Sequence, residues 1–181
     1  MKKYAIITSA ILILTGCSAS VAIATGENAQ VPTSTTVTKV ETFSTQQLVK
    51  IAKIERNTTK MKKVVKYLKT RVGRTSYVFS GSSPYGWDCS GLVKWTYKRF
   101  GLELPHSANK QGHVGSRVSE PKLGDIVVFA YSGSTSFYHS AIYIGNGKIV
   151  HAHQQRKTTV IEPLANYKRS QIRFVRLVTT N

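Results

Sequence analysis

The chain has 181 residues, room for one ordinary domain with short additional segments, and 41% of them are hydrophobic, enough for a packed core. Its 26 Lys and Arg against 8 Asp and Glu give a formal net charge of +18. This excess points to a polyanionic partner such as nucleic acid, anionic lipid or an anionic wall polymer, and it carries no information about the fold.

Residues 1–24 are typical of an export signal. Lys2 and Lys3 precede an uncharged run whose most apolar part, residues 5–14, is short for a membrane span but fits the h-region of a signal peptide. The segment Leu14-Thr15-Gly16-Cys17 is similar to the cleavage box of bacterial lipoproteins, in which the Cys becomes lipidated.

Two alternatives to lipidation at Cys17 stay open. Ala22-Ile23-Ala24 fits ordinary signal cleavage, and without cleavage residues 5–24 could form a membrane anchor. All three routes export the remaining chain to the cell envelope, as a lipoprotein or secreted to the wall. We therefore expect no nucleic acid partner.

The chain contains two cysteines, Cys17 and Cys89. If Cys17 is lipidated or removed, Cys89 is left alone, and a single Cys in an exported protein suggests chemistry rather than structure. A Cys17–Cys89 disulfide is the structural alternative.

Residues 25–59 are predicted to be a polar tether followed by a short basic helix. The segment 25–43 is rich in Thr, Ser and Val, as in an extended or disordered linker. Ser44, with Gln47 three residues later, fits a capping box. We expect one helix over 45–56 and a second over 60–72, with a break near 57–59.

The stretch 50–74 carries ten Lys or Arg and one acid, Glu55. It is either the solvated face of an ordinary helix or a surface that binds anionic wall polymers or a membrane surface.

Cys89 follows a turn-rich segment and opens a helical pattern that ends near Gly101. Asp88 is a good N-cap and would place Cys89 in the first helical turn. There the helix dipole would lower the pKa of the thiol, and the N–H groups of Cys89 and Ser90 could hold the oxygen of a tetrahedral intermediate. The structural alternative is a buried Cys on the apolar helix face.

Strand patterns follow the helix. Apolar or alternating runs cover residues 125–131, 139–144, 148–153 and 172–178, and Gly145-Asn146-Gly147 is a strong hairpin signal. Helices first and antiparallel strands afterwards predict an α+β fold, with the Cys-bearing helix packed on a small antiparallel sheet.

Histidine is the natural base for a thiol, and the sequence contains five. His106 and His113 lie in a polar loop and are expected to face water. His139 begins a strand, and His151 lies on the partner strand. A two-residue loop would place these two on opposite faces, whereas a three-residue loop places them on one face, with His153 opposite His139 as a rival partner.

Residues from about 61 to 178 resemble the NlpC-type, papain-like family of peptidoglycan peptidases. The matching pieces, in family order, are Tyr77-Val78-Phe79-Ser80-Gly81, Asp88-Cys89-Ser90-Gly91-Leu92-Val93, Leu104-Pro105 with Gln111, Leu123-Gly124-Asp125-Ile126-Val127, His139-Ser140-Ala141-Ile142-Tyr143-Ile144-Gly145 and Val150-His151-Ala152. The sequence departs from the family pattern at Ser80, Lys122, Ser140 and Ala141, and none of these changes removes a catalytic group.

The resemblance implies a catalytic domain over 60–181 with Cys89 as nucleophile, His139 as base and His151 as the third polar residue. It implies that Tyr77 lines the site and that the substrate is a peptide stem of peptidoglycan. In relatives that trim free stems, the residue matching Asp88 is implied to hold the amine of an N-terminal L-Ala. The extra segments here look too small and polar to form a cap over the cleft, so we expect an open groove.

The expected activity is a cysteine endopeptidase that cuts the D-γ-glutamyl–diamino acid bond through an acyl-thioester, with no metal and no cofactor. Three alternatives stay open: an N-acetylmuramoyl-L-alanine amidase with the same triad, an acyl transferase, and a wall-polymer-binding protein with a vestigial catalytic domain.

Overall fold

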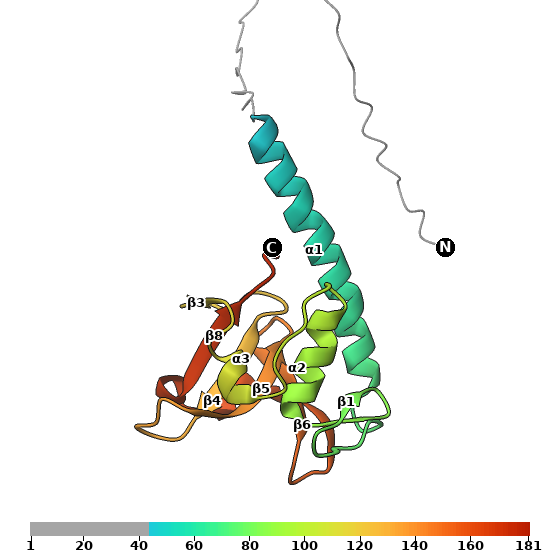
Figure 1. Cartoon of the computed structure of the whole chain (residues 1–181), viewed down its shortest axis with the longest axis vertical. Coiled ribbons are helices and arrows are strands. Elements are labelled where there is room, and N and C mark those ends of the chain that lie inside the picture. The colour runs from blue at the N-terminus through green and yellow to red at the C-terminus, as the bar shows by residue number, and fades with distance from the viewer. Residues whose placement is uncertain (1–43) are drawn as a thin grey trace, which may run out of the picture. The chain divides into compact units, whose positions relative to one another are not determined.

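A computed structural model describes residues 44–181. The predicted export signal, Cys17 and the tether over 25–43 lie outside the described residues. The elements follow one another as in Figure 1: α1 Thr45–Thr70, β1 Ser82–Ser83, β2 Gly86–Trp87, α2 Cys89–Lys98, α3 Ala108–Gln111, β3 Ser116–Val118, β4 Ile126–Ala130, β5 Phe137–Tyr143, β6 Lys148–His153, β7 Thr158–Pro163 and β8 Ile172–Arg176.

The centre of the domain is a six-stranded sheet in the order β3-β8-β4-β5-β6-β7, in which every neighbouring pair is antiparallel. Along β4, Ile126 and Val128 belong to one apolar cluster and Val127 and Phe129 to another, because successive side chains of a strand point to opposite faces. The first cluster also contains apolar side chains of α1 and α2, so the two helices cover one face of the sheet. The predicted α+β fold is confirmed.

α1 is one continuous helix, so the expected break near residues 57–59 is wrong. The hydroxyl of Thr58 donates to the carbonyl oxygen of Ile54 at 2.8 Å and accepts from the backbone N–H of Asn181 at 2.9 Å. The Asn57 amide donates to the carbonyl oxygen of Thr179. These bonds satisfy polar side chains that would otherwise favour a turn, and the predicted domain boundary at 59/60 falls inside the helix.

The two halves of α1 have different surroundings. Met61, Val65 and Leu68 are buried in the core, whereas Leu48 and Val49 are exposed. The capping box of Ser44 and Gln47 is present, as expected. No helix of residues 44–181 is both long and apolar enough to cross a membrane.

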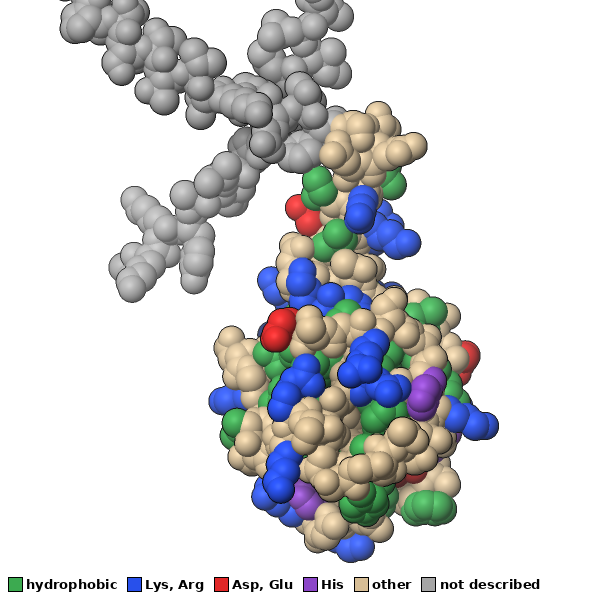
Figure 2. Space-filling model, turned by 90° about the vertical axis from the view of Figure 1, so that its left-hand side faces the viewer, with side chains coloured by type: hydrophobic (Ala, Val, Ile, Leu, Met, Phe, Trp, Pro, Cys, Tyr) green, Lys and Arg blue, Asp and Glu red, His purple; other side chains and the backbone are tan. Residues whose placement is uncertain are grey.

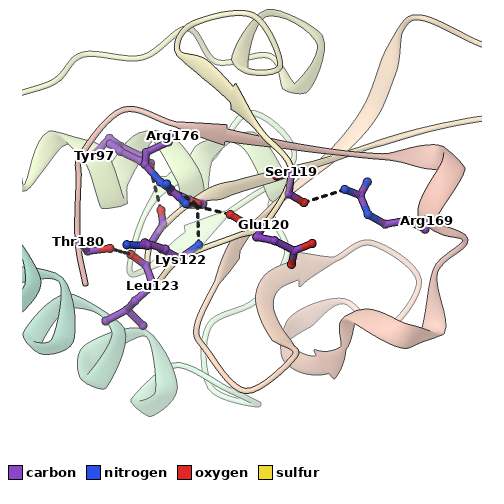
Figure 3. A network of polar contacts seen from close by, with 10 residues as sticks. Tyr97, Ser119, Glu120, Lys122, Leu123, Arg169, Arg176 and Thr180 are labelled. Atoms are coloured by element: carbon purple, nitrogen blue, oxygen red, sulfur yellow. Dashed lines mark hydrogen bonds and ion pairs between the residues drawn. The ribbon is translucent and has the colours of Figure 1, made fainter.

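The C-terminal strand is tied to the turn before β4 by a polar network (Figure 3). Arg176 on β8 donates to both carboxylate oxygens of Asp125. Beside this pair the Tyr97 hydroxyl of α2 donates to the carbonyl oxygen of Gly124, and the Thr180 hydroxyl donates to that of Leu123. The network connects α2, β8 and the start of β4, and so helps hold the Cys89 helix against the sheet.

Candidate active site

Asp88 is the N-cap of α2, so Cys89 is the first helical residue, as predicted. Oδ1 of Asp88 accepts from the backbone N–H of Gly91 at 2.7 Å and from the hydroxyl of Ser90 at 2.9 Å. Oδ2 accepts from the backbone N–H of Ser80, which has a left-handed φ of 58° that glycine adopts more easily. The cap anchors the helix end and presents the partly exposed, free thiol of Cys89.

The fourth contact of Asp88 corrects the expectation for His106. Nε2 of His106 lies 2.9 Å from Oδ1 of Asp88, so His106 is part of the site rather than a solvated loop residue. His113 is exposed, as expected, and its Nδ1 lies 2.8 Å from the carbonyl oxygen of Asn109.

The β5–β6 hairpin has the three-residue loop. Ile142 pairs with Val150 and Tyr143 with Ile149, and the backbone N–H of Ile144 donates to the carbonyl oxygen of Lys148. This register places His139 and His151 on one face of the sheet, where His139 Nε2 lies 2.8 Å from His151 Nδ1. His151 rather than His153 is therefore the residue in contact with His139.

A β-bulge precedes His139. On β4, Phe129 pairs with His139 and Ala130 with Phe137, so Tyr138 is the extra residue. A bulge of this kind turns the strand locally and re-aims the neighbouring side chains. The Tyr138 side chain stacks on Tyr131, with ring centroids 4.3 Å apart.

Sequence reasoning missed Glu162 on β7. Its Oε2 lies 3.2 Å from Nε2 of His151, and the residue is only 6% exposed. No sequence motif surrounds Glu162. The β6–β7 ladder pairs His151 with Val160, and Glu162 lies two residues further along β7, on the same face of the strand as Val160, so strand pairing brings Glu162 to the site.

The titration of the site differs from the expectation. Burial, followed by the charge of His151, lowers the pKa of His139 to about 3. Burial also lowers the pKa of His151, to about 4, against the opposing effect of Glu162. For Cys89, burial raises the thiol pKa and outweighs the hydrogen bonds from Ser140 and Ser90, so the predicted lowering is wrong.

β5 and α2 are coupled beneath the thiol by a buried amide. Gln111 donates to the carbonyl oxygen of Ser90 at 2.9 Å, and the Ser140 hydroxyl donates to Oε1 of Gln111 at 2.9 Å. Ser140 follows His139 directly on β5. These hydrogen bonds fix the position of β5, which carries His139, relative to the N-terminal end of α2, which carries Cys89.

Two cavities meet at the thiol. One, of about 250 Å³, is lined by His139, His151 and Tyr167, and the other, of about 380 Å³, by Ser90 and His106. Cys89, Tyr77, Tyr138 and Gln154 line both of them. A thiol with space on both sides can attack a carbonyl group in the middle of a chain.

The arrangement is suited to nucleophilic acyl transfer. Cys89 can supply the nucleophile, His139 can take and return its proton, and His151 holds the second nitrogen of His139. Among residues 44–181, no three His, Cys, Asp or Glu side chains are grouped as metal ligands.

The NlpC/P60 family matches residues 73–176, and the chain belongs to this family. Over 104 residues it is 36% identical to the gamma-DL-glutamyl hydrolase of Bacillus subtilis, a match that covers 55% of this chain and 25% of the relative. Over 79 residues it is 48% identical to the murein DD-endopeptidase MepS/murein LD-carboxypeptidase of Escherichia coli, covering 42% of this chain and 41% of the relative. The matched region therefore spans less than half the length of either relative.

A solved structure has a similar fold. The crystal structure of an NlpC/P60 family protein from Bacillus cereus superimposes with a TM-score of 0.59 and 28% identity, covering 66% of this chain and 40% of that chain. The papain-like arrangement expected from the sequence is thus confirmed at the level of the fold.

Proposed function

We propose that this protein is a cell-wall hydrolase, a cysteine endopeptidase that cleaves the peptide stems of peptidoglycan. The observation that carries the proposal is the position of Cys89 at the junction of two cavities, beside a strand whose His139 contacts His151 at 2.8 Å. The thiol attacks the stem carbonyl, and His139 accepts its proton and then passes it to the departing amine. Water hydrolyses the acyl-thioester in a second step.

The N–H groups at the start of α2 would stabilise the oxyanion. The backbone N–H of Cys89 and of Ser90 belongs to the first helical turn, where no intrahelical partner exists. Tyr77 lines both cavities beside the thiol and would contact the substrate on either side of the bond cut.

The favoured bond joins D-glutamate, through its γ-carboxyl, to the diamino acid of the stem. The name of the Bacillus subtilis relative, a gamma-DL-glutamyl hydrolase, supports this choice. The name of the Escherichia coli relative, a murein DD-endopeptidase, supports a murein substrate with a different bond.

The contacts of Asp88 favour stems that are still attached to glycan. Its carboxylate is 6% exposed and already contacts four groups, from Ser80, Ser90, Gly91 and His106. A carboxylate engaged in this way is poorly placed to hold the free amine of a stem. Among the described residues, none from α1 lines either cavity, in keeping with an open groove.

The protein would act outside the cytoplasm. Residues 1–24 would direct export, with Cys17 lipidated or the chain secreted to the wall, residues 25–59 would serve as the spacer, and residues 60–181 would carry the activity. The Lys and Arg side chains of residues 50–74 would bind anionic wall polymers or the membrane surface. Lys and Arg side chains gather along α1 and on the adjoining surface in Figure 2.

Digestion of intact peptidoglycan beside free stem peptides, with products identified by mass, tests the proposal. We expect cleavage between D-glutamate and the diamino acid both in stems attached to glycan and in free stems. Exclusive cleavage of free stems would contradict the open groove. Release of whole stems from muramic acid would identify an amidase, and transfer of the acyl group to an added amine would identify an acyl transferase. Binding without any product would identify a vestigial domain.

A further inference from the structure

The carboxylate of Glu162 is buried at the far end of the histidine pair. Besides His151, its Oε2 accepts from the Tyr167 hydroxyl at 2.7 Å, and its Oε1 accepts from Arg156 at 2.9 Å. Burial alone would raise the pKa of Glu162, but the hydrogen bond from Tyr167 and the influence of His151 and Arg156 outweigh it and lower the pKa. The group is therefore an anion at neutral pH.

An anionic Glu162 determines which nitrogen of His151 carries the proton. A carboxylate only accepts hydrogen bonds, so the neutral His151 ring carries its hydrogen on Nε2, 3.2 Å from Oε2. Nδ1 of His151 is then a bare acceptor and takes the hydrogen of His139 Nε2 at 2.8 Å. Nδ1 of His139 is left without a hydrogen and is free to accept a proton.

We propose that Glu162 is a positioning residue of the catalytic site, which acts through His151 to keep the reactive nitrogen of His139 unprotonated in the resting enzyme. The inference rests on the proposed function, because the proton that His139 accepts is that of the Cys89 thiol. Tyr167 and Arg156 hold the carboxylate in place, and Glu162 in turn holds His151. The catalytic residues are thus supported by a second set of polar groups, of which Glu162 is buried.

The same carboxylate offsets the charge that forms during the reaction. When the proton moves from Sγ of Cys89 to Nδ1 of His139, the imidazole becomes a cation in a site whose burial disfavours cations. His153 and Arg156 also face the pair and oppose this charge, as their effects on His139 and His151 indicate. Among the described residues that shift the pKa of His151, Glu162 is the one that raises it, so it favours positive charge on the histidine pair from the His151 side.

The test compares Glu162→Gln and Glu162→Leu in the full chain with Glu103→Leu as the matched control. Glu103 is an exposed carboxylate paired with Lys98, and it lines neither cavity at the thiol. Gln keeps an acceptor for His151 and loses only the charge, so we expect kcat to fall about 10-fold. Leu loses both the acceptor and the charge, so we expect kcat to fall about 100-fold. KM should change little in either variant. Glu103→Leu should leave kcat unchanged.

Two further readouts separate positioning from a loss of folding. Without the carboxylate the imidazolium is less stable. The acid limb of the profile of kcat against pH should therefore move to lower pH in Glu162→Gln, and the plateau value of kcat should fall. Nitrogen-15 NMR of the histidine rings should show the Nε2–H form of His151 in the parent protein and a mixture of tautomers in Glu162→Leu. This measurement needs no substrate, so it remains informative if peptidoglycan is not cleaved.

An unchanged tautomer of His151 in Glu162→Leu would overturn the inference, as would full kcat in both variants. If Glu162→Leu fails to fold, Glu162→Gln decides through the position of its acid limb. An acid limb that does not move, with a reduced plateau, would also contradict the proposed role.

Discussion

The imidazole of His139 is held through one nitrogen by His151, and replacing His151 removes that contact. His151→Ala should lower kcat roughly 100-fold or more, the range expected for losing the group that orients a base. His153→Ala is the matched variant, because Nδ1 of His153 accepts from the backbone N–H of Arg156 and not from His139. Steady-state kinetics of both variants checks the ranking. A larger loss of kcat in His153→Ala than in His151→Ala would show that His153, and not His151, orients the imidazole of His139.

The titration of Cys89 predicts how the thiol reacts with an alkylating reagent. Because burial raises the pKa of the thiol, little thiolate exists at mildly acidic pH, and the labelling rate should rise steadily with pH into the alkaline range. Loss of the proton acceptor should appear only near pH 3 to 4, where His139 and His151 become protonated. Labelling of a Cys17→Ser protein across pH measures this, and a rate that is already maximal at pH 5 would indicate a preformed thiolate.

The sequence predicted the residues whose positions follow from local geometry. Asp88 and Cys89 stand at a helix cap, and His139 and His151 share a hairpin, so spacing alone limited their arrangement to a few possibilities. His106 and Glu162 reach the site through the loop after α2 and the outer strand β7. Pairings of that kind depend on the whole fold and leave no pattern in the nearby residues.

The hairpin between β5 and β6 shows the same limit at the scale of an element. Asn146-Gly147 fits a two-residue loop as well as a three-residue loop, and the adjoining residues favour neither. In the folded protein the carbonyl oxygen of Gly147 accepts from the backbone N–H of Leu164, and the Gly147 N–H donates to the hydroxyl of Tyr143. The contact with Leu164 comes from beyond β7, so it could not be read from the hairpin itself.

The α1 helix carries a prediction of its own. Its exposed Lys and Arg side chains should make binding to purified walls salt-sensitive, because charges of this kind are screened over about 8 Å at physiological ionic strength. Replacing Lys50, Lys53 and Arg56 with Gln should weaken wall retention at low salt and leave hydrolysis of soluble stems unchanged. A pull-down across salt concentrations, with and without the anionic polymers of the wall, checks it. Retention on walls that does not change with salt concentration would contradict an electrostatic role.

At the scale of the whole molecule, the fold was predictable because the secondary-structure patterns and the family motifs point to the same architecture. The helical and strand patterns occur in the order of an α+β fold, and the family motifs fall at the start of α2 and within β5 and β6. The continuity of α1 was not predictable, because the bonds that hold Asn57 and Thr58 come from residues 179 and 181 at the other end of the chain.

The central claim is that Cys89 forms an acyl-thioester with a peptide stem. Mixing the protein with a defined stem substrate, quenching in acid and mapping peptides by mass spectrometry tests it directly. We predict that the Cys89 peptide gains the mass of the fragment ending in D-glutamate, less one water, that hydroxylamine removes it, and that Cys89→Ala shows neither adduct nor hydrolysis. Undiminished hydrolysis by Cys89→Ala, with no adduct in the parent protein, would contradict the account.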